Sequence, residues 1–440
     1  MTLTQKISNR LENANQGYFC AYAIAAAFIT YFAMYAFRKP FSAGTYADLS
    51  IWGIDYKVIA IVSQVLGYTL SKFLGIRVVS ELKASYRIKS IIVLIGIAWV
   101  ALLFFAITPT PYNVLFLFLN GLPLGMIWGI VFSFLEGRRY TEFLGAGMAC
   151  SFIVASGAVK DVGRTLVLNY GVSEFWMPFL AGMIFIPALV VGVLMLRAIP
   201  APSAADEAHR TRRVPMDGQA RKRFFLTFAM GIVLVVAIYI CLTIFRDVRD
   251  NFAVEIWSAL GYADQPHVLT AAEIPIAIGV LVIVGSMVFI KSNRLAFYLN
   301  LGLITFSGVL LLITTALFRY TNLNPVVWMI LNGFSMYLAY MLYQAFLFER
   351  WIALFRYRSN IGFLLYIADA FGYLGSTSIM FAKNFGSGSI SWLQLFMKIT
   401  YVTAFLCIAL GLCSIVYFRM KERQLGASAD VEPTLLAEPS

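Results

Sequence analysis

Twelve apolar runs of about 20 residues occupy most of this 440-residue chain, and they leave few choices for its fold. A helical run of about 20 residues crosses the ~30 Å hydrocarbon core of a bilayer. Inside lipid, only helices and closed barrels pair all their backbone polar groups, and runs this long are typical of helices. The sequence therefore predicts an all-α membrane protein. Its twelve transmembrane helices are expected at 18–37, 56–76, 88–107, 112–135, 143–168, 175–196, 224–245, 272–290, 295–318, 324–348, 361–383 and 390–418.

Composition agrees with a membrane protein and argues against a soluble one. Hydrophobic residues make up 60% of the chain and charged residues 13%, with a mean hydropathy of +0.80, whereas about a quarter of a soluble domain is charged. The five cysteines fall inside apolar runs without the spacing of metal ligands, so we expect them to be packing residues. No metal or cofactor is predicted. Hydrolase and kinase motifs are also missing from the sequence, so we do not expect an enzyme.

Basic residues indicate the orientation in the membrane. An even number of helices puts both termini on one side, and loops rich in Lys and Arg face the cytoplasm. Most of the 34 Lys and Arg residues lie on the side of the termini, whereas 108–111 and 169–174 on the opposite side contain none. We therefore expect a multi-pass protein of the cell (cytoplasmic) membrane with both termini cytoplasmic. The net charge of +12 then reflects topology and attraction to anionic lipid, without a nucleic-acid partner.

The chain divides into two halves that resemble each other. A polar, proline-containing stretch at 198–223 predicts a cytoplasmic linker. It separates an N-terminal six-helix bundle at 18–197 from a C-terminal one at 224–419, and 1–17 and 420–440 are expected to be cytoplasmic ends. We read the first apolar run as a retained helix, because it is too long for a signal-peptide core. Three unusual features recur at nearly constant spacing: Arg38-Lys39-Pro40-Phe41-Ser42 with Arg249-Asp250-Asn251-Phe252-Ala253, Glu136 with Glu349, and Asp161 with Asp369. Such spacing predicts two pseudo-symmetric bundles made by parallel duplication.

Charged residues next to the apolar runs predict a central anion site. An ionisable group in hydrocarbon costs at least a few kcal/mol, so it usually faces a partner or a water-filled path. Arg38 and its repeat partner Arg249 offer planar guanidinium groups that each grip two oxygens of an anion, and Lys72 adds a point charge. The alternative is that Arg38 and Lys39 extend to the membrane interface, as basic residues at helix ends often do.

The organisation resembles that of the major facilitator superfamily of secondary transporters, and three patches resemble one of its subfamilies, the organophosphate:phosphate antiporters. The first patch, Tyr35-Ala36-Phe37-Arg38-Lys39-Pro40-Phe41-Ser42, resembles the Arg-Lys-Asn-Phe signature of their first helix. The second, Gly67-Tyr68-Thr69-Leu70-Ser71-Lys72-Phe73-Leu74-Gly75, is similar to the second-helix pattern Tyr-Gly-x-Ser-Lys-Phe-x-x-Gly. The third, Gly362-Phe363 with Phe371-Gly372-Tyr373-Leu374-Gly375-Ser376, resembles the eleventh helix.

This resemblance implies alternating-access antiport of a small organic anion, with Arg38 and Lys72 as substrate-binding residues. Two residues fit the seventh-helix arginine of that family. Arg249 matches the local pattern and is preferred, while Arg246 is the first charge after the apolar run. They are three residues apart and therefore lie on one face of a helix.

The fifth helix departs from the family, whose antiporters carry a substrate-linked histidine there. The two histidines of this chain, His209 and His267, lie elsewhere. The fifth run instead carries Lys160, a further candidate for substrate binding, and Asp161 and Arg164, which we expect to pair with each other. In the eleventh run, Asp369 is the better candidate for carrying a coupling proton, since no cation adjoins it in sequence. Lys383 and Lys398 are the cations expected to reach it.

Charges at the cytoplasmic helix ends resemble the inner gate of the superfamily, and surface charge is the alternative. These residues are Glu136, Arg138, Glu349 and Arg350. The sequence thus favours a monomeric secondary carrier of a phosphate ester or carboxylate, working by antiport in the lipid bilayer. Two alternatives stay open. One is a proton-coupled symporter of a zwitterionic or neutral solute that uses Asp369, and the other is a non-transporting receptor on the same fold.

Overall fold

The computed structural model describes residues 3–136, 138, 141–202, 218–355, 361–385 and 390–429, and this part of the chain is almost entirely helical. The first half comprises α1 (Leu3–Glu12), α2 (Gln16–Tyr35), η1 (Pro40–Ala43), β1 (Ser50–Ile51), β2 (Ile54–Asp55), α3 (Tyr56–Glu81), η2 (Ala84–Tyr86), α4 (Arg87–Ile107), α5 (Val114–Leu124), α6 (Ile127–Phe132), α7 (Thr141–Tyr170), α8 (Met177–Ile184) and α9 (Ile186–Arg197). The second half comprises α11 (Gly218–Asn251), α12 (Ala253–Ala259), α13 (Val268–Ser286), η3 (Met287–Phe289), α14 (Asn293–Tyr320), α15 (Pro325–Leu342), η4 (Tyr343–Leu347), α16 (Phe348–Phe355), α17 (Ile361–Phe385) and α18 (Trp392–Ala429).

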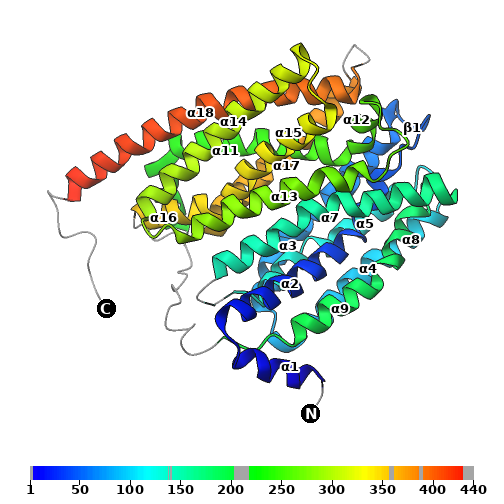
Figure 1. Ribbon diagram of the computed structural model, residues 1–440, viewed down its shortest axis with the longest axis horizontal. Coiled ribbons are helices and arrows are strands. Elements are labelled where there is room, and N and C mark those ends of the chain that lie inside the picture. The colour runs from blue at the N-terminus through cyan, green and yellow to red at the C-terminus, as the bar shows by residue number, and fades with distance from the viewer. Residues whose placement is uncertain are drawn as a thin grey trace.

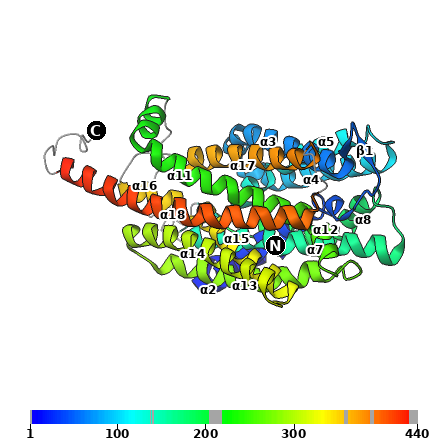
Figure 2. The same ribbon diagram turned by 90° about the horizontal axis from the view of Figure 1, so that it is seen from above.

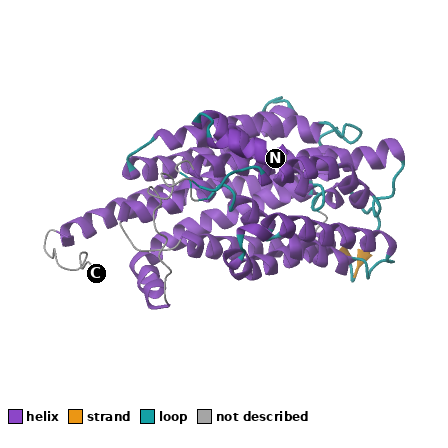
Figure 3. Ribbon diagram, turned by 90° about the horizontal axis from the view of Figure 1, so that it is seen from below, coloured by secondary structure: helices purple, strands orange, loops and turns teal. Residues whose placement is uncertain are grey.

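These elements form two bundles of helices side by side, α2–α9 and α11–α18 (Figures 1 and 2). The bundles lie against each other at the end that carries the β1–β2 hairpin, which Figure 3 marks in orange. Toward the opposite end, where α1 and α16 lie, they spread apart (Figure 1). We call these the far end and the terminal end.

The twelve-helix fold predicted from the sequence is confirmed. Within the described residues, ten helices are long and apolar enough to cross a membrane, and the bent pair α8 and α9, with 46° between its parts, makes eleven. Helix α17, with 25 residues, occupies the place of the remaining predicted run. The predicted linker and C-terminal segment lie largely outside the described residues, at 203–217 and 430–440.

Helix α11 is longer than the apolar run predicts. The run ends at 245, whereas the helix continues to Asn251 and includes Arg246, Asp247 and Arg249. These charged side chains face protein partners inside the bundle rather than lipid, so the helix has no reason to stop where hydropathy falls. Helix α18 likewise continues past the predicted end at 418, to Ala429.

Close helix crossings depend on residues without a side chain. A Cβ atom added at Gly67 of α3 would lie 2.1 Å from the Phe118 carbonyl oxygen of α5. Between the halves, a Cβ atom added at Gly157 of α7 would lie 2.5 Å from the Leu269 carbonyl oxygen of α13. In lipid, such small residues let backbones approach, because apolar helices gain little by leaving hydrocarbon and rely on packing. The α7–α13 crossing is therefore a principal contact between the halves.

A carboxylate anchors the far-end loop. Glu174 accepts hydrogen bonds from the backbone nitrogens of Thr45 at 2.6 Å and Tyr46 at 2.5 Å, and from the Thr45 hydroxyl at 2.9 Å. Burial, Tyr56 and the Glu174 carboxylate raise the pKa of Tyr46 well above its ordinary value. The Tyr46 hydroxyl therefore stays protonated and donates to the Phe41 carbonyl at 3.0 Å. These bonds fix the hairpin over the far ends of α2 and α3.

Replacing Gly157 by alanine is expected to lower the apparent melting temperature of the purified protein by several degrees. The added methyl group meets a backbone carbonyl, and overpacking of this kind costs about 1–3 kcal/mol. The matched control is Gly96→Ala in α4, where nothing lies within 4 Å of the added atom. Thermal unfolding in detergent measures both variants. Equal melting temperatures would show that α7 and α13 are not in close contact.

Candidate functional site

Polar side chains of both halves meet midway along the bundle, between α3 and α17. On the side of the first half, the guanidinium carbon of Arg38 lies 3.7 Å from the centre of the Tyr68 ring, a cation–π contact. Gln64 of α3 donates to the Arg38 carbonyl at 2.9 Å, which fixes the chain where it leaves α2. Arg38 is only 8% exposed, so it does not extend to the membrane interface.

Lys72 and Asp369 join the halves at this centre. The Lys72 ammonium lies 2.5 Å from Asp369 Oδ2, and the Tyr239 hydroxyl donates to Oδ1 of the same carboxylate at 2.6 Å. Gln344 in turn donates to the Tyr239 hydroxyl at 2.5 Å. Asp369 therefore has a cation partner that sequence spacing did not suggest, since Lys72 lies in the other half. Lys383, expected near Asp369, instead lies 3.5 Å from Asp55 of the hairpin.

Arg246, not the preferred Arg249, supplies the seventh-helix guanidinium at the centre. Its guanidinium carbon lies 4.5 Å from the centre of the Tyr340 ring, and Nη1 donates to the Tyr340 hydroxyl. Nε and Nη2 also donate to Asp247 Oδ1, at 3.0 and 2.7 Å. The central cluster thus comprises Arg38, Tyr68 and Lys72 from the first half and Tyr239, Arg246, Asp247, Tyr340, Gln344, Asp369 and Tyr373 from the second.

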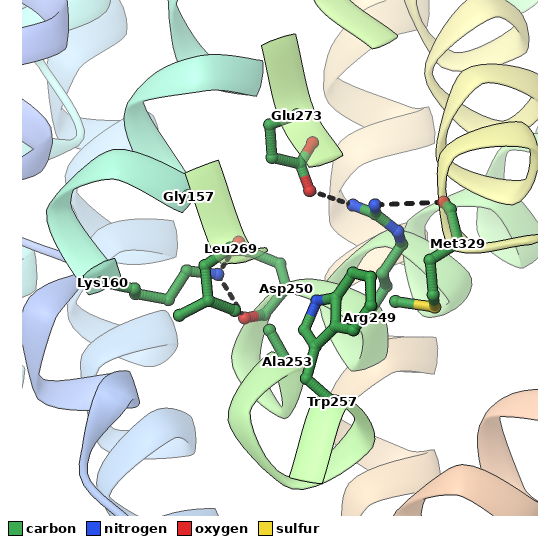
Figure 4. Close-up of a pocket in the computed structure, with 9 residues that line it drawn as sticks. All are labelled: Gly157, Lys160, Arg249, Asp250, Ala253, Trp257, Leu269, Glu273 and Met329. Carbon is green, nitrogen blue, oxygen red and sulfur yellow. Dashed lines mark hydrogen bonds and ion pairs between the residues drawn. The ribbon is translucent and has the colours of Figure 1, made fainter. Parts of the chain in front are cut away.

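Arg249 belongs to a small pocket nearer the far end (Figure 4). It donates to Glu273 Oε1 of α13 at 2.5 Å and to the Met329 carbonyl of α15 at 3.4 Å. One turn of α11 thus separates two roles. Because the helix is enclosed by protein on several sides, Arg246 turns toward the centre and Arg249 toward α13 and α15.

A second cluster closes the far end, and we call it the far-end seal. Its middle is Asp250 of α11, which lies 2.5 Å from the Lys39 ammonium and 2.7 Å from the Lys160 ammonium. Both lysines belong to the first half and are further satisfied, Lys39 by Asn251 Oδ1 at 2.9 Å and Lys160 by the Asp250 carbonyl at 2.7 Å. Ser156 also donates to Asp250. The structure therefore places Lys160 in the contact between the halves rather than at the central cluster.

The remaining far-end bonds also cross between the halves. The Lys57 ammonium lies 2.5 Å from Glu255. Asp161 accepts from the Thr270 hydroxyl at 2.6 Å and lies 3.2 Å from His267 Nδ1. The expected pair of Asp161 with Arg164 is therefore wrong, because Asp161 faces α13 across the α7–α13 crossing while Arg164 lies almost a turn further along α7.

The candidate gate residues lie at the terminal end. Arg138 donates to the Pro200 carbonyl and packs on the Phe19 ring at 4.6 Å, and Arg350 donates to Asn293 Oδ1 at 2.7 Å. These contacts stay within each half. Glu136 and Glu349 lie at the same end of their helices. Between described residues, the ion pairs that join the halves lie at the far end and at the centre.

Comparison with known proteins gives the family and the fold. Residues 40–421 match DUF5690, a family of unknown function. The chain belongs to this family. No curated protein matches it.

Three solved structures have the same fold as this DUF5690 protein. A peptide transporter POT in complex with alafosfalin matches with a TM-score of 0.62 and 14% identity, over 96% of this chain and 99% of that one. The nucleoside transporter NupG matches with a TM-score of 0.58 and 14% identity, over 91% and 99%. A D-xylose-proton symporter matches with a TM-score of 0.55 and 14% identity, over 89% and 97%. The fold is that of the major facilitator superfamily, whereas the likeness to organophosphate antiporters stays a prediction.

Sequence reasoning missed several residues of these clusters. Tyr239, Gln344 and Glu273 carry no motif, and uncharged polar residues in apolar runs are too common to single out. Asp250 did carry a signal, because it lies inside the repeated pattern around Arg249. A carboxylate in that position requires a cation nearby, and the matching lysines come from the other half of the chain.

Replacing Asp250 by asparagine is expected to loosen the far-end seal. Two buried lysines would lose their shared carboxylate, and breaking a buried pair costs about 3–5 kcal/mol. A cysteine introduced at Ala253, which is 7% exposed, reports the change through its reaction with a membrane-impermeant maleimide added from the far side. Labelling should accelerate at least about tenfold, which corresponds to ~1.4 kcal/mol.

The control for this variant is Asp264→Asn, which removes a carboxylate from an exposed position of the same region. Both variants are compared with the chain lacking the introduced cysteine, so that native cysteines are subtracted. Unchanged labelling in the Asp250 variant would mean that the seal does not depend on this carboxylate.

Proposed function

We propose that this protein is a secondary active transporter that carries a small organic anion across the cell membrane by alternating access. One observation carries the proposal: cations from both halves of a transporter fold, Arg38 and Lys72 on one side and Arg246 on the other, line a common centre. A site between two halves is where rocking motions expose a bound solute first to one side and then to the other.

An anionic solute fits this centre better than a neutral one. Arg38 touches tyrosine rings and has no carboxylate partner in the described part of the chain, and its Nε is buried without a hydrogen-bond acceptor. Burying an unpaired charge is unfavourable, so the empty site gains by taking up an anion. Arg38 lies within the first patch that resembles the antiporter signature.

The conformation favours loading from the terminal end. The far-end seal buries Lys39, Lys57 and Lys160 almost completely, whereas the side chain of Lys72 at the centre is 24% exposed. The bundles spread apart toward the terminal end (Figure 1). With both termini cytoplasmic, as the basic residues predict, this conformation opens to the cytoplasm. A single chain already supplies both sides of the site, so a monomer suffices.

The pair of Lys72 and Asp369 gives a physical reason for antiport. In the empty protein this pair ties α3 to α17 at the centre. An anion that approaches Lys72 competes with Asp369 for the ammonium group and weakens the tie. If only the loaded protein can rearrange, each transport step in one direction must be matched by a loaded step in the other.

Proton-coupled symport of a zwitterionic or neutral solute is the second candidate. The observation behind it is that Asp369, a carboxylate 15% exposed in its side chain, lies where the halves meet. Uptake driven by external acidification, and lost in Asp369→Asn, would favour symport. A receptor on the same fold would instead bind its ligand without any flux.

Replacing Arg38 or Arg246 by glutamine is expected to lower anion exchange in proteoliposomes at least about tenfold. Each change removes a charge from the centre, and truncating one partner of a buried charge pair costs about 2–5 kcal/mol. The assay is counterflow across a panel of labelled carboxylates and phosphate esters. Arg294→Gln is the matched control, because Arg294 pairs with Glu422 at an exposed site, 69% accessible in its side chain. Full exchange by the Arg38 variant would contradict the proposal.

A further inference from the structure

The central cluster holds an unequal number of positive and negative groups. Its cations are Arg38, Lys72 and Arg246, and its carboxylates are Asp247 and Asp369. Lys72 pairs with Asp369 at 2.5 Å, and Arg246 pairs with Asp247 at 2.7 Å. Arg38 is left over, which gives the empty centre one excess positive charge.

The environment of Arg38 shows that this excess is not neutralised by the protein. Its guanidinium carbon lies 3.7 Å from the Tyr68 ring centre and 6.0 Å from that of Tyr35, and both rings are neutral partners. Its Nε atom is buried without a hydrogen-bond partner. A cation–π contact contributes about 0.5–2 kcal/mol, less than a carboxylate would provide. Arg38 is therefore the group that still needs an anion.

The lysines of the far-end seal do not change this count. Lys39 and Lys160 also outnumber their carboxylate, Asp250, but both ammonium groups have a second oxygen within 2.9 Å. Their side chains are 9% and 3% exposed, so a ligand would have to break the contact between the halves to reach them. The seal is occupied by its own bonds.

The walls of the centre are aromatic. Tyr68 and Tyr373 meet edge to face at 6.4 Å between ring centres, and Tyr239 and Tyr340 stack at 5.3 Å. The Lys72 ammonium lies 5.2 Å from the Tyr373 ring centre. Flat rings with hydroxyl groups at their edges offer faces to a ring-shaped solute and hydrogen bonds to its polar groups.

We infer that the substrate is a monoanion with a ring-shaped or planar body, a monocarboxylate rather than a doubly charged phosphate ester. One negative charge neutralises the centre, whereas a second would be left unpaired in a poorly solvated site, which is unfavourable. The inference rests on the proposed function and narrows its substrate class. It also separates this protein from the organophosphate carriers that the patch around Arg38 resembles.

Two probes with the same ring test the charge preference: phenylacetate, a monoanion, and phenyl phosphate, a dianion at pH 8. Binding of each to the purified full-length protein is measured by calorimetry in detergent. At pH 8 phenylacetate is expected to bind at least about tenfold more tightly, a difference of ~1.4 kcal/mol. The second pKa of a phosphate ester is about 6, so phenyl phosphate becomes a monoanion as the pH falls to about 5. The gap between the probes should then shrink, without any variant.

Asp369→Asn provides the reciprocal test. The substitution removes one of the two carboxylates and leaves Lys72 unpaired, so the centre should prefer a dianion. Phenyl phosphate is then expected to bind at least as tightly as phenylacetate at pH 8, a reversal that a merely damaged site would not produce. The control is Asp264→Asn, which removes a carboxylate outside the centre and should keep the original order.

Tighter binding of phenyl phosphate than phenylacetate to the unaltered protein at pH 8 would overturn the inference, as would failure of both probes to bind. So would an unchanged order of the probes in a folded Asp369→Asn protein. None of these outcomes touches the proposed function, which fails only if counterflow shows no exchange of any organic anion. A protein that exchanges phosphate esters in preference to carboxylates would be an anion transporter with a different charge balance.

Discussion

Buried charges that find their partners across the two halves are the interaction on which this arrangement depends. In a medium of low polarity an unpaired ion is far more costly than a paired one, and pairing is effective only when further hydrogen bonds complete it. Asp250 shows the consequence. Its carboxylate receives one lysine from the loop after α2 and another from α7, so three elements meet at one residue. Neither half could bury its own share of these groups alone.

The same principle separates the two clusters along α11. Asp250 and Arg249 belong to closed contacts near the far end, and Arg246 belongs to the centre. Because ion pairs can re-form with other partners, such contacts suit a protein whose halves must part and rejoin. Apolar packing at the α7–α13 crossing, with Gly157 against the α13 backbone, supplies the part of the contact that involves no charge.

The fold was predictable from the sequence because hydrophobic length is a local property. Twelve runs of about 20 apolar residues identify twelve spans without knowledge of their neighbours. The ends of the spans were less predictable. Helix α11 passes through Arg246 and Arg249, since these side chains are solvated by protein rather than by lipid.

The candidate site was predictable only in part, since it depends on pairs between distant parts of the chain. Arg38 and Lys72 stood out as charges next to apolar runs, and the structure brings both to the Tyr68 ring. The partner of Asp369 was not predictable, because Lys72 is separated from it by most of the chain and by the linker. The choice between Arg246 and Arg249 depended on which neighbouring helix packs against each side of α11, and periodicity within one helix carries no such information.

The tenth span contains a turn of π-helix at η4, and its geometry bears on Asp369. A π turn accommodates one residue more than an α turn, and such turns are often found at functional sites. The residues after it are therefore rotated by about 100° relative to an uninterrupted α-helix. Gln344 lies inside this turn and donates to the Tyr239 hydroxyl that holds Asp369. Tightening the turn to an α-helix would carry Gln344 around the helix axis and away from Tyr239, so a change in winding of one turn is communicated directly to the carboxylate that links the halves.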